Sequence, residues 1–224
     1  MSRYLVFSDV DETLISLKSM FDFLRFSLVR QHGAAGEQRF AEHRRGFADA
    51  AAAGVPREKL NRDFYRLFAG QQQAEVETAG EAWYAERSAS AGFFVESTVA
   101  ALAGHRAAGC PVVLVSGSFA PVLAPIARQV RAEAVLSTEL VVRSGRYTGE
   151  VVQPMIGQAK RAAVRRVLAE RPDVRAEDCF AYGDHPSDIP MLDCVGRPVA
   201  VGSHPELAEY LEQRRLAGSA LPPA

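Results

Sequence analysis

Cysteine is scarce in this sequence, and long apolar runs and a targeting pattern are missing. Three cysteines occur, Cys110, Cys179 and Cys194, without the spacing of a metal site. A sparse, odd count is typical of a reducing compartment, where cysteines pack as small apolar side chains. There is no run of about 20 apolar residues, so we expect no membrane-spanning helix. The chain starts without the basic-then-apolar pattern of a secretory signal. These absences predict a cytoplasmic protein.

A strong charge of one sign is also missing. The chain carries 26 Lys and Arg against 27 Asp and Glu, a net charge of −1. Without a basic field, the composition gives no reason to expect binding to nucleic acid or to a membrane surface. Hydrophobic residues make up 48% and charged residues 24%, an ordinary globular balance. The length of 224 residues suits one large domain, or one domain with a smaller insert.

Strand-like and helical segments alternate along most of the chain. Strands are expected at residues 4–7, 111–115, 179–183 and 198–202, with a hairpin over 135–152. Helical patterns separate them, and this alternation predicts an α/β fold, a mostly parallel sheet with helices on both faces.

A long stretch near the start of the chain is purely helical in pattern. Ser19 is placed to cap its first helix, and Gly33 follows the end of that helix. We therefore expect residues 1–16 and 96–224 to form the sheet domain and residues 17–95 to form an inserted helical unit.

Residues with useful chemistry follow the expected strands or lie on a helix returning to the sheet. They are Asp9, Asp11, the turn Ser116-Gly117-Ser118, Lys160, Asp184 and Asp188. The carboxyl ends of parallel strands meet at one edge of the sheet, where ligands bind. These side chains should therefore converge, with the helical insert above them as a roof.

The types of these residues suggest phosphoryl transfer. Two carboxylates at the end of a buried strand are costly without a compensating cation. Mg²⁺ prefers such oxygen ligands, and Asp9 and Asp184 can supply them. The amides and hydroxyl of the serine turn and the ammonium of Lys160 suit a phosphate group. One aspartate can then attack phosphorus to form an acyl-phosphate, while a second protonates the leaving alcohol and later activates water.

Four segments in order resemble the four motifs of the haloacid dehalogenase (HAD) superfamily. They are DVDETL, VSGS, the lysine of GQAK, and YGDHPSDIPML. Residues 101–201 are most similar to its phosphoserine-phosphatase-like subgroup, subfamily IB. The resemblance implies a Rossmann-like core with a parallel sheet, an all-helical cap of the C1 type inserted after the first motif, and Mg²⁺ as the cofactor.

The resemblance also implies roles for the residues of the first three motifs. Asp9 resembles the nucleophile and a metal ligand. Asp11 resembles the general acid and base, with its backbone carbonyl touching the metal. Ser116 and Lys160 resemble the phosphate binders, helped by the N–H group of Gly117.

The resemblance also implies roles for two aspartates of the fourth motif, and at two positions this sequence differs from the family. Asp184 resembles the third metal ligand, and Asp188 the acid that orients Lys160 or a metal-bound water. Glu12 and His185 stand where the family more often has a small residue. Both leave the reactive groups in place but can alter access or substrate preference.

The expected function is a Mg²⁺-dependent phosphatase that hydrolyses a small phosphorylated metabolite through a phospho-aspartate. Neither nucleic acid nor a membrane is an expected partner, and a homodimer is left open. A phosphotransferase would share the same site. A dehalogenase or phosphonatase is disfavoured by Asp11 and Asp184. A receiver-like signalling module would use similar residues, but its acceptor lies on a middle strand without a helical roof. A non-catalytic relative is disfavoured because no expected reactive group is missing.

Overall fold

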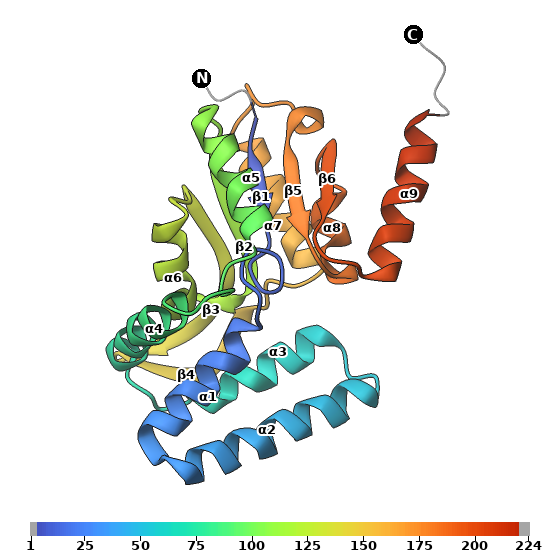
Figure 1. The fold of residues 1–224 in the computed structure, drawn as a ribbon. Coiled ribbons are helices and arrows are strands. Elements are labelled where there is room, and N and C mark those ends of the chain that lie inside the picture. Colours follow the sequence, from blue (N-terminus) through green and yellow to red (C-terminus); the bar gives the residue numbers. More distant parts are fainter. Residues whose placement is uncertain (1–3, 220–224) are drawn as a thin grey trace.

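The computed structural model describes residues 4–219, with a six-stranded sheet at its centre (Figure 1). The strands are β1 (Val6–Ser8), β2 (Val112–Phe119), β3 (Ala134–Arg143), β4 (Arg146–Gln153), β5 (Phe180–Gly183) and β6 (Arg197–Ala200). They lie in the order β4-β3-β2-β1-β5-β6, and only the β3–β4 pair is antiparallel among these strands. The predicted α/β class with a mostly parallel sheet is confirmed.

Helices fill the connections between the strands. They are α1 (Ser19–His32), α2 (Ala34–Ala52), α3 (Arg57–Tyr65), α4 (Gln73–Ser88), α5 (Glu96–Ala107), α6 (Ala120–Gln129), α7 (Gln158–Ala169), α8 (Ile189–Leu192) and α9 (Pro205–Ser219), with short 3₁₀ turns η1 (Arg66–Phe68), η2 (Ala176–Asp178) and η3 (Pro186–Asp188). In Figure 1, α1, α2 and α3 lie below the carboxyl ends of the strands. In contrast, α4 packs along α6 beside the sheet.

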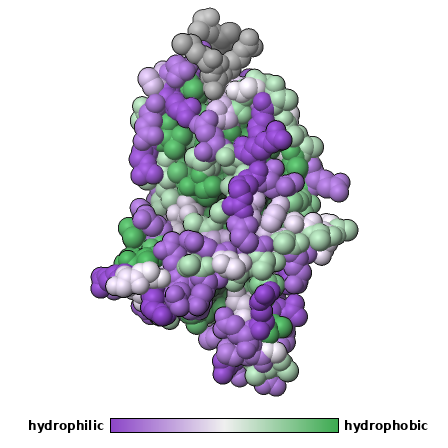
Figure 2. All heavy atoms as spheres, turned by 90° about the vertical axis from the view of Figure 1, so that its left-hand side faces the viewer, coloured by the Kyte–Doolittle hydropathy of each residue, from purple (hydrophilic) through white to green (hydrophobic). Residues whose placement is uncertain are grey.

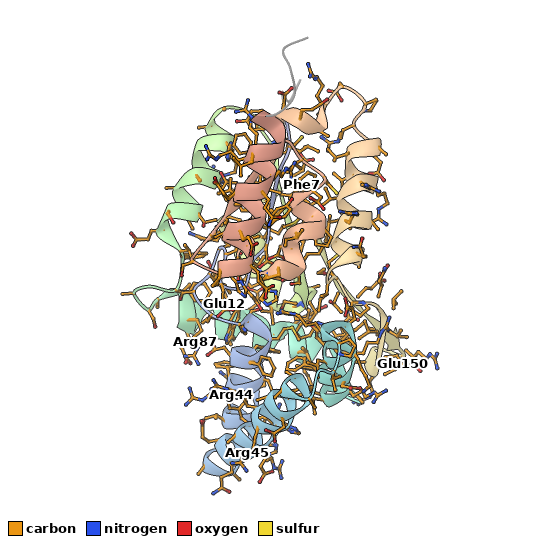
Figure 3. All side chains as sticks on the ribbon, turned by 90° about the vertical axis from the view of Figure 1, so that its right-hand side faces the viewer. Phe7, Glu12, Arg44, Arg45, Arg87 and Glu150 are labelled. Atoms are coloured by element: carbon orange, nitrogen blue, oxygen red, sulfur yellow. The ribbon has the colours of Figure 1, made fainter. Side chains whose placement is uncertain are left out.

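Apolar side chains of the central strand region point alternately to the two faces of the sheet. Val6 belongs to one buried cluster, and its neighbours Leu5 and Phe7 belong to the other. The first cluster includes side chains of α1, α4, α5 and α6, and the second includes side chains of α7, α8 and α9. Figure 3 shows Phe7 inside the molecule, between the helices. This alternation is the two-residue period of a strand covered on both faces.

The start of α1 differs from the expectation. The helix begins at Ser19 with Lys18 as its N-cap residue, so the prediction that Ser19 caps this helix is wrong. The Ser19 side chain is buried and donates a hydrogen bond to Ser118 Oγ at 2.9 Å. Its hydroxyl therefore joins the first helix after the Asp9 loop to β2 instead of satisfying the helix end.

The serine turn also differs, because β2 continues to Phe119 and includes Ser116, Gly117 and Ser118. Ser116 pairs with Ser137 and Phe119 pairs with Thr138, so three steps along β2 match one step along β3. A strand with such an irregularity bends and changes the direction of its side chains. The segment thus remains part of the sheet, but with an interrupted register, directly before α6.

The exposed apolar surface is scattered. Among the described helices, none has both the length and the apolar character needed to cross a bilayer. On the face seen in Figure 2, hydrophilic side chains predominate and apolar ones form small groups. Among the described residues, the exposed large apolar side chains are Val29, Val142, Val152 and Leu216, which come from four different elements.

Candidate active site

The loop after β1 brings Asp9 beneath the sheet edge. The Asp9 amide donates to the carbonyl of Tyr182 on β5 at 2.9 Å, which continues the pairing of the two strands by one residue. Beyond it, the carbonyl of Val10 accepts hydrogen bonds from the amides of Leu14 and Ile15 at 2.8 and 3.0 Å. This tight loop holds the Asp9 backbone firmly, and Asp9 is only 6% exposed.

Lys160 links Asp9 to a second carboxylate. Its ammonium donates to Asp9 Oδ1 at 2.6 Å and to Asp188 Oδ1 at 2.7 Å, and the lysine is 4% exposed. Burial alone lowers the pKa of Lys160, but the carboxylates of Asp188 and Asp9 outweigh that effect and hold its pKa above the ordinary value. The lysine is therefore charged at neutral pH.

Three carboxylates converge at this point with more negative charge than Lys160 can balance. Asp9, Asp184 and Asp188 each offer an oxygen within 4.8 Å of the others. Burial raises the pKa of Asp9 well above its ordinary value and also raises that of Asp184, although a hydrogen bond from Thr13 Oγ1 at 2.8 Å opposes the shift at Asp184. An all-oxygen set with excess negative charge fits a hard divalent cation.

Asp11 lies apart from this carboxylate cluster. Its Oδ1 atom is buried and has no hydrogen-bond partner among the described residues. Burial raises the pKa of Asp11 to about 6, although hydrogen bonding to Ser19 lowers it in part. A carboxyl group with this pKa can both give and take a proton near neutral pH.

The β2 segment supplies groups suited to an anion. Ser116 Oγ accepts a hydrogen bond from the Ser118 amide at 3.1 Å, which leaves its own proton available. The Gly117 carbonyl accepts from Asn61 Nδ2 at 2.9 Å, Tyr65 Oη at 3.0 Å and Thr138 Oγ1 at 2.8 Å. These three donors fix the peptide of Gly117 relative to α3 and β3.

One cavity of about 720 Å³ brings the predicted site residues together. All seven line it: Asp9, Asp11, Ser116, Gly117, Lys160, Asp184 and Asp188. Its remaining walls come mainly from α1, α2 and α3. Figure 3 shows Glu12 at the level where the sheet domain meets these helices. Three arginines of the helical insert, Arg25, Arg44 and Arg57, line the cavity. Arg62 instead donates to the carbonyl of Val151 at 2.6 Å.

Comparison with known proteins agrees with this arrangement. Residues 6–193 match the family described as haloacid dehalogenase-like hydrolase. The chain belongs to this family. The superfamily and the hydrolase class predicted from the four motifs are confirmed. The carboxylates that could hold a metal come from the first motif (Asp9) and the fourth motif (Asp184 and Asp188) of this HAD chain.

Relatives of this HAD chain include phosphatases. A probable phosphatase of Mycobacterium tuberculosis is 39% identical over 100 residues, which are 45% of this chain and 34% of that protein. A phosphoserine phosphatase of the same species is 27% identical over 216 residues, covering 93% of this chain and 68% of that protein. The match to the probable phosphatase thus spans only about a third of that protein. The similarity to the phosphoserine-phosphatase-like subgroup is confirmed.

A solved structure extends the similarity to nearly the whole HAD chain. A protein of unknown function from Bordetella pertussis has a TM-score of 0.83 and is 26% identical, covering 96% of this chain and 97% of that one. The helices of the insert are therefore included in the shared fold.

Several contacts of this HAD site were not predicted. Thr13 is fully buried and holds Asp184, and its place in the first motif was the available signal. Asn61 and Tyr65 hold the Gly117 carbonyl, but their separation from it by more than fifty residues leaves no local pattern to detect. Glu12 has φ of 61°, a left-handed conformation that favours glycine, which explains why a small residue is more usual there.

His185 lines the same HAD cavity, where it can affect access to the site. Its ring accepts from the Ser187 amide at 3.0 Å, and its Nε2 lies 2.9 Å from Arg57 Nη1 of α3. Burial, with Arg57 nearby, lowers the pKa of His185 to about 4. The histidine is therefore neutral at physiological pH and connects the fourth motif to the helical insert.

Proposed function

We propose that this chain is a Mg²⁺-dependent phosphatase that hydrolyses a small phosphomonoester through a phospho-aspartate at Asp9. The observation that carries this proposal is the buried contact of Lys160 with Asp9, in one cavity with Asp11 and Ser116. The phosphatase relatives support it. The matched phosphoserine phosphatase makes a phosphorylated amino acid one natural substrate to test.

The first half of the reaction forms the acyl-phosphate. Ser116 Oγ, the Gly117 amide and the Lys160 ammonium hold the phosphoryl oxygens while a carboxylate oxygen of Asp9 attacks phosphorus. The bond between phosphorus and the ester oxygen breaks, and Asp11 donates its proton to the departing alcohol. The pKa of Asp11, about 6, leaves a useful protonated fraction near neutral pH.

The second half removes the phosphoryl group from Asp9. Asp11, now ionised, takes a proton from water, and the water oxygen attacks phosphorus. The phosphorus–oxygen bond to Asp9 breaks, which releases inorganic phosphate and restores both carboxyl groups. A phosphotransferase would differ only in using a second alcohol in place of water.

The proposed cofactor site uses the carboxylates of Asp9 and Asp184 and the backbone carbonyl of Asp11. When bound, Mg²⁺ supplies positive charge that offsets the charge on the attacking and transferring oxygens. Asp188 orients Lys160 through their 2.7 Å contact. The excess negative charge of the carboxylate cluster supports this assignment.

We also propose that residues 17–95 form a cap and that residues 1–16 and 96–224 form the core. Helices α1, α2 and α3 supply the cap side of the cavity, and α4 braces the cap against α6. Location in the cytoplasm stays a prediction, with which the three free thiols are compatible. The homodimer likewise stays a prediction.

The test compares wild type with Asp9→Asn over a panel of phosphorylated metabolites and Mg²⁺. We expect loss of phosphate release and of trapped acyl-phosphate in the variant, because an amide does not attack phosphorus. Asp178→Asn, at a half-exposed position outside the cavity, is the control and should retain the wild-type rate. Retained turnover in Asp9→Asn would rule out the proposed nucleophile. Comparing free phosphate with phosphate moved to added alcohols separates hydrolysis from transfer.

A further inference from the structure

The cap side of the cavity has an apolar wall that the phosphate chemistry does not use. Met20 and Phe21 come from α1, Phe47 from α2, and Leu60 and Phe64 from α3, and all five line the cavity. The three phenylalanine rings contact one another, with centroid separations of 5.8 Å for Phe21–Phe47, 5.3 Å for Phe21–Phe64 and 5.9 Å for Phe47–Phe64. Phe21 and Phe47 remain only half-buried, so part of each ring is available to a ligand.

The residues of α2 that line the cavity lie on one face of that helix. On α2, Phe40, Arg44, Phe47, Ala48 and Ala51 line the cavity. Their spacing of three and four residues places them on one side of the helix. The apolar wall is therefore a continuous feature of the cap instead of a single exposed ring.

Charged groups on the cap wall are mostly engaged already. Arg25 Nε donates to Glu37 at 2.9 Å, and Asp22 Oδ1 accepts from Trp83 at 2.7 Å and from Arg87 at 2.6 Å. An amino-acid phosphate would need both a free acceptor for its ammonium group and a free donor for its carboxylate. Arginine and aspartate side chains in these contacts are poorly placed to supply that pair.

One ion pair, one hydrogen bond to a neutral ring and one exception complete the wall. Lys18 pairs with Glu12 at 3.3 Å, and Arg57 lies against the ring of His185. Arg44 is the exception: it is exposed and has no hydrogen bond or ion pair within the part of the chain that the structure describes. Figure 3 shows Arg44 and its neighbour Arg45 on the cap, away from the sheet. A single free cation does not recognise a zwitterion.

The volume of the cavity is also larger than a phosphorylated amino acid requires. Pockets of about 300–1,000 Å³ hold drug-sized ligands, and this cavity of about 720 Å³ lies in that range. Its catalytic groups occupy one end, so the space beside the phenylalanine rings is left for the alcohol part of the ester.

We propose that the alcohol part of the substrate is an extended aliphatic group, which packs against Phe21, Phe47 and Leu60 while its phosphate contacts Lys160 and Ser116. This inference rests on the phosphatase function proposed above and names its substrate class. Binding energy then comes from apolar area removed from water, which grows with chain length.

The test measures kcat/KM for methyl, ethyl, butyl, hexyl and octyl phosphate and for phosphoserine, with Mg²⁺ and below micelle-forming concentrations. We expect kcat/KM to rise by roughly two- to fourfold for each added methylene until the cavity is filled, and to be higher for hexyl phosphate than for phosphoserine. A flat or falling series, or a preference for phosphoserine, overturns the inference.

A variant that fills the apolar space provides an independent test. Ala48 is exposed and lines the cavity, so Ala48→Trp adds bulk without disturbing the core. It should lower kcat/KM for octyl phosphate by about tenfold or more relative to ethyl phosphate. Val29→Ala is the control, because Val29 is 38% exposed and does not line the cavity, and it should leave the whole series unchanged. An unchanged octyl-to-ethyl ratio in Ala48→Trp overturns the inference.

The two proposals fail in different ways. If wild-type protein releases phosphate from none of these esters and none of the metabolite panel, the phosphatase function itself is wrong. If it hydrolyses phosphoserine through Asp9 but shows no gain with chain length, the phosphatase function stands and only the aliphatic substrate class is wrong.

Discussion

At the scale of single residues, the site depends on a buried lysine held between two buried carboxylates. Lys160, Asp9 and Asp188 are each less than a tenth exposed. Breaking such a contact by moving one partner is strongly unfavourable, because it leaves a buried charge without compensation. Gly183 permits the arrangement, since a Cβ there would lie 2.7 Å from Asp188 Cβ and 3.0 Å from its Oδ2.

Gly183→Ala should therefore push Asp188 away from Lys160. We expect a loss of stability of about 1–3 kcal/mol from overpacking and a fall in kcat of about tenfold or more, because the lysine loses its orienting contact. Urea unfolding and phosphate release measure the two effects. Gly104→Ala on α5 is the matched control: beyond the backbone of its own helix, a Cβ there would meet no atom within 4 Å, so this variant should gain about 0.5–1 kcal/mol of stability. Equal effects at the two glycines would contradict this account.

Asp11 gives a prediction about pH. Its pKa in the folded protein is about 6, above the ordinary value of 3.8, because of burial. The folded state then binds the proton more tightly than the unfolded state, so Asp11 makes the protein less stable as pH rises from about 4 to about 6. Above that window the full cost of burying its charge remains.

Asp11→Asn removes this charge while keeping the shape of the side chain. In EDTA at pH 7.5 we expect the variant to be more stable than wild type by on the order of 1–3 kcal/mol, with the difference vanishing near pH 4. Urea unfolding at both pH values measures it. Asp178→Asn, at a half-exposed position, should show no comparable gain at pH 7.5. A less stable Asp11→Asn at pH 7.5 would show that the buried carboxylate carries no such cost.

At the scale of elements, α3 is the link between the cap and the phosphate-binding segment of β2. Asn61 and Tyr65, four residues apart on one face of α3, both donate to the Gly117 carbonyl. Thr138 of β3 donates to the same oxygen. The Gly117 carbonyl of β2 is thus held by donors from α3 and β3. The position of the Gly117 amide in the site depends on these contacts.

Tyr65→Phe removes one of these donors without changing the packing of the ring. We expect a loss of about 0.5–1.5 kcal/mol, the usual net value of one hydrogen bond, and a higher KM for the phosphate ester, because the Gly117 amide is held less firmly. Tyr147→Phe is the matched control: Tyr147 is 5% exposed, and its hydroxyl has no hydrogen bond among the described residues. The idea fails if both variants lose the same stability and keep the wild-type KM.

The elements also show what the sequence can and cannot predict. The strands and the convergence of Asp9, Lys160 and Asp184 follow from local periodicity and from the rule that parallel strands end at one edge. The continuation of β2 through Gly117 does not, because the strand is completed by pairing with β3, and Ser-Gly-Ser is locally a turn pattern. Ser19 is likewise a good helix cap by type, but its hydroxyl forms a tertiary contact with Ser118.

At the scale of the whole molecule, the charged side chains of the site come from parts of the chain that are far apart in sequence. The loop after β1 supplies Asp9, α7 supplies Lys160, and the β5 end and η3 supply Asp184 and Asp188. Three carboxylates face one ammonium group, so their mutual repulsion opposes the closure of the sheet edge. A cation bound there would stabilise the folded molecule as a whole, because the unfolded chain cannot gather these ligands.

Magnesium should therefore raise the melting temperature at constant ionic strength. At a concentration of 100 times Kd, we expect a gain of about 2.7 kcal/mol, which for a domain of this size is a rise of roughly 5–10 °C. Asp184→Asn should melt higher than wild type in EDTA, because one repelling charge is gone, and should lose most of the Mg²⁺-induced rise. Asp178→Asn should keep that rise in full. Calorimetry in EDTA and in Mg²⁺, with NaCl matching the ionic strength, separates these outcomes. If Asp184→Asn gains as much from Mg²⁺ as wild type, the cation acts elsewhere on the molecule and the carboxylate cluster is not its site.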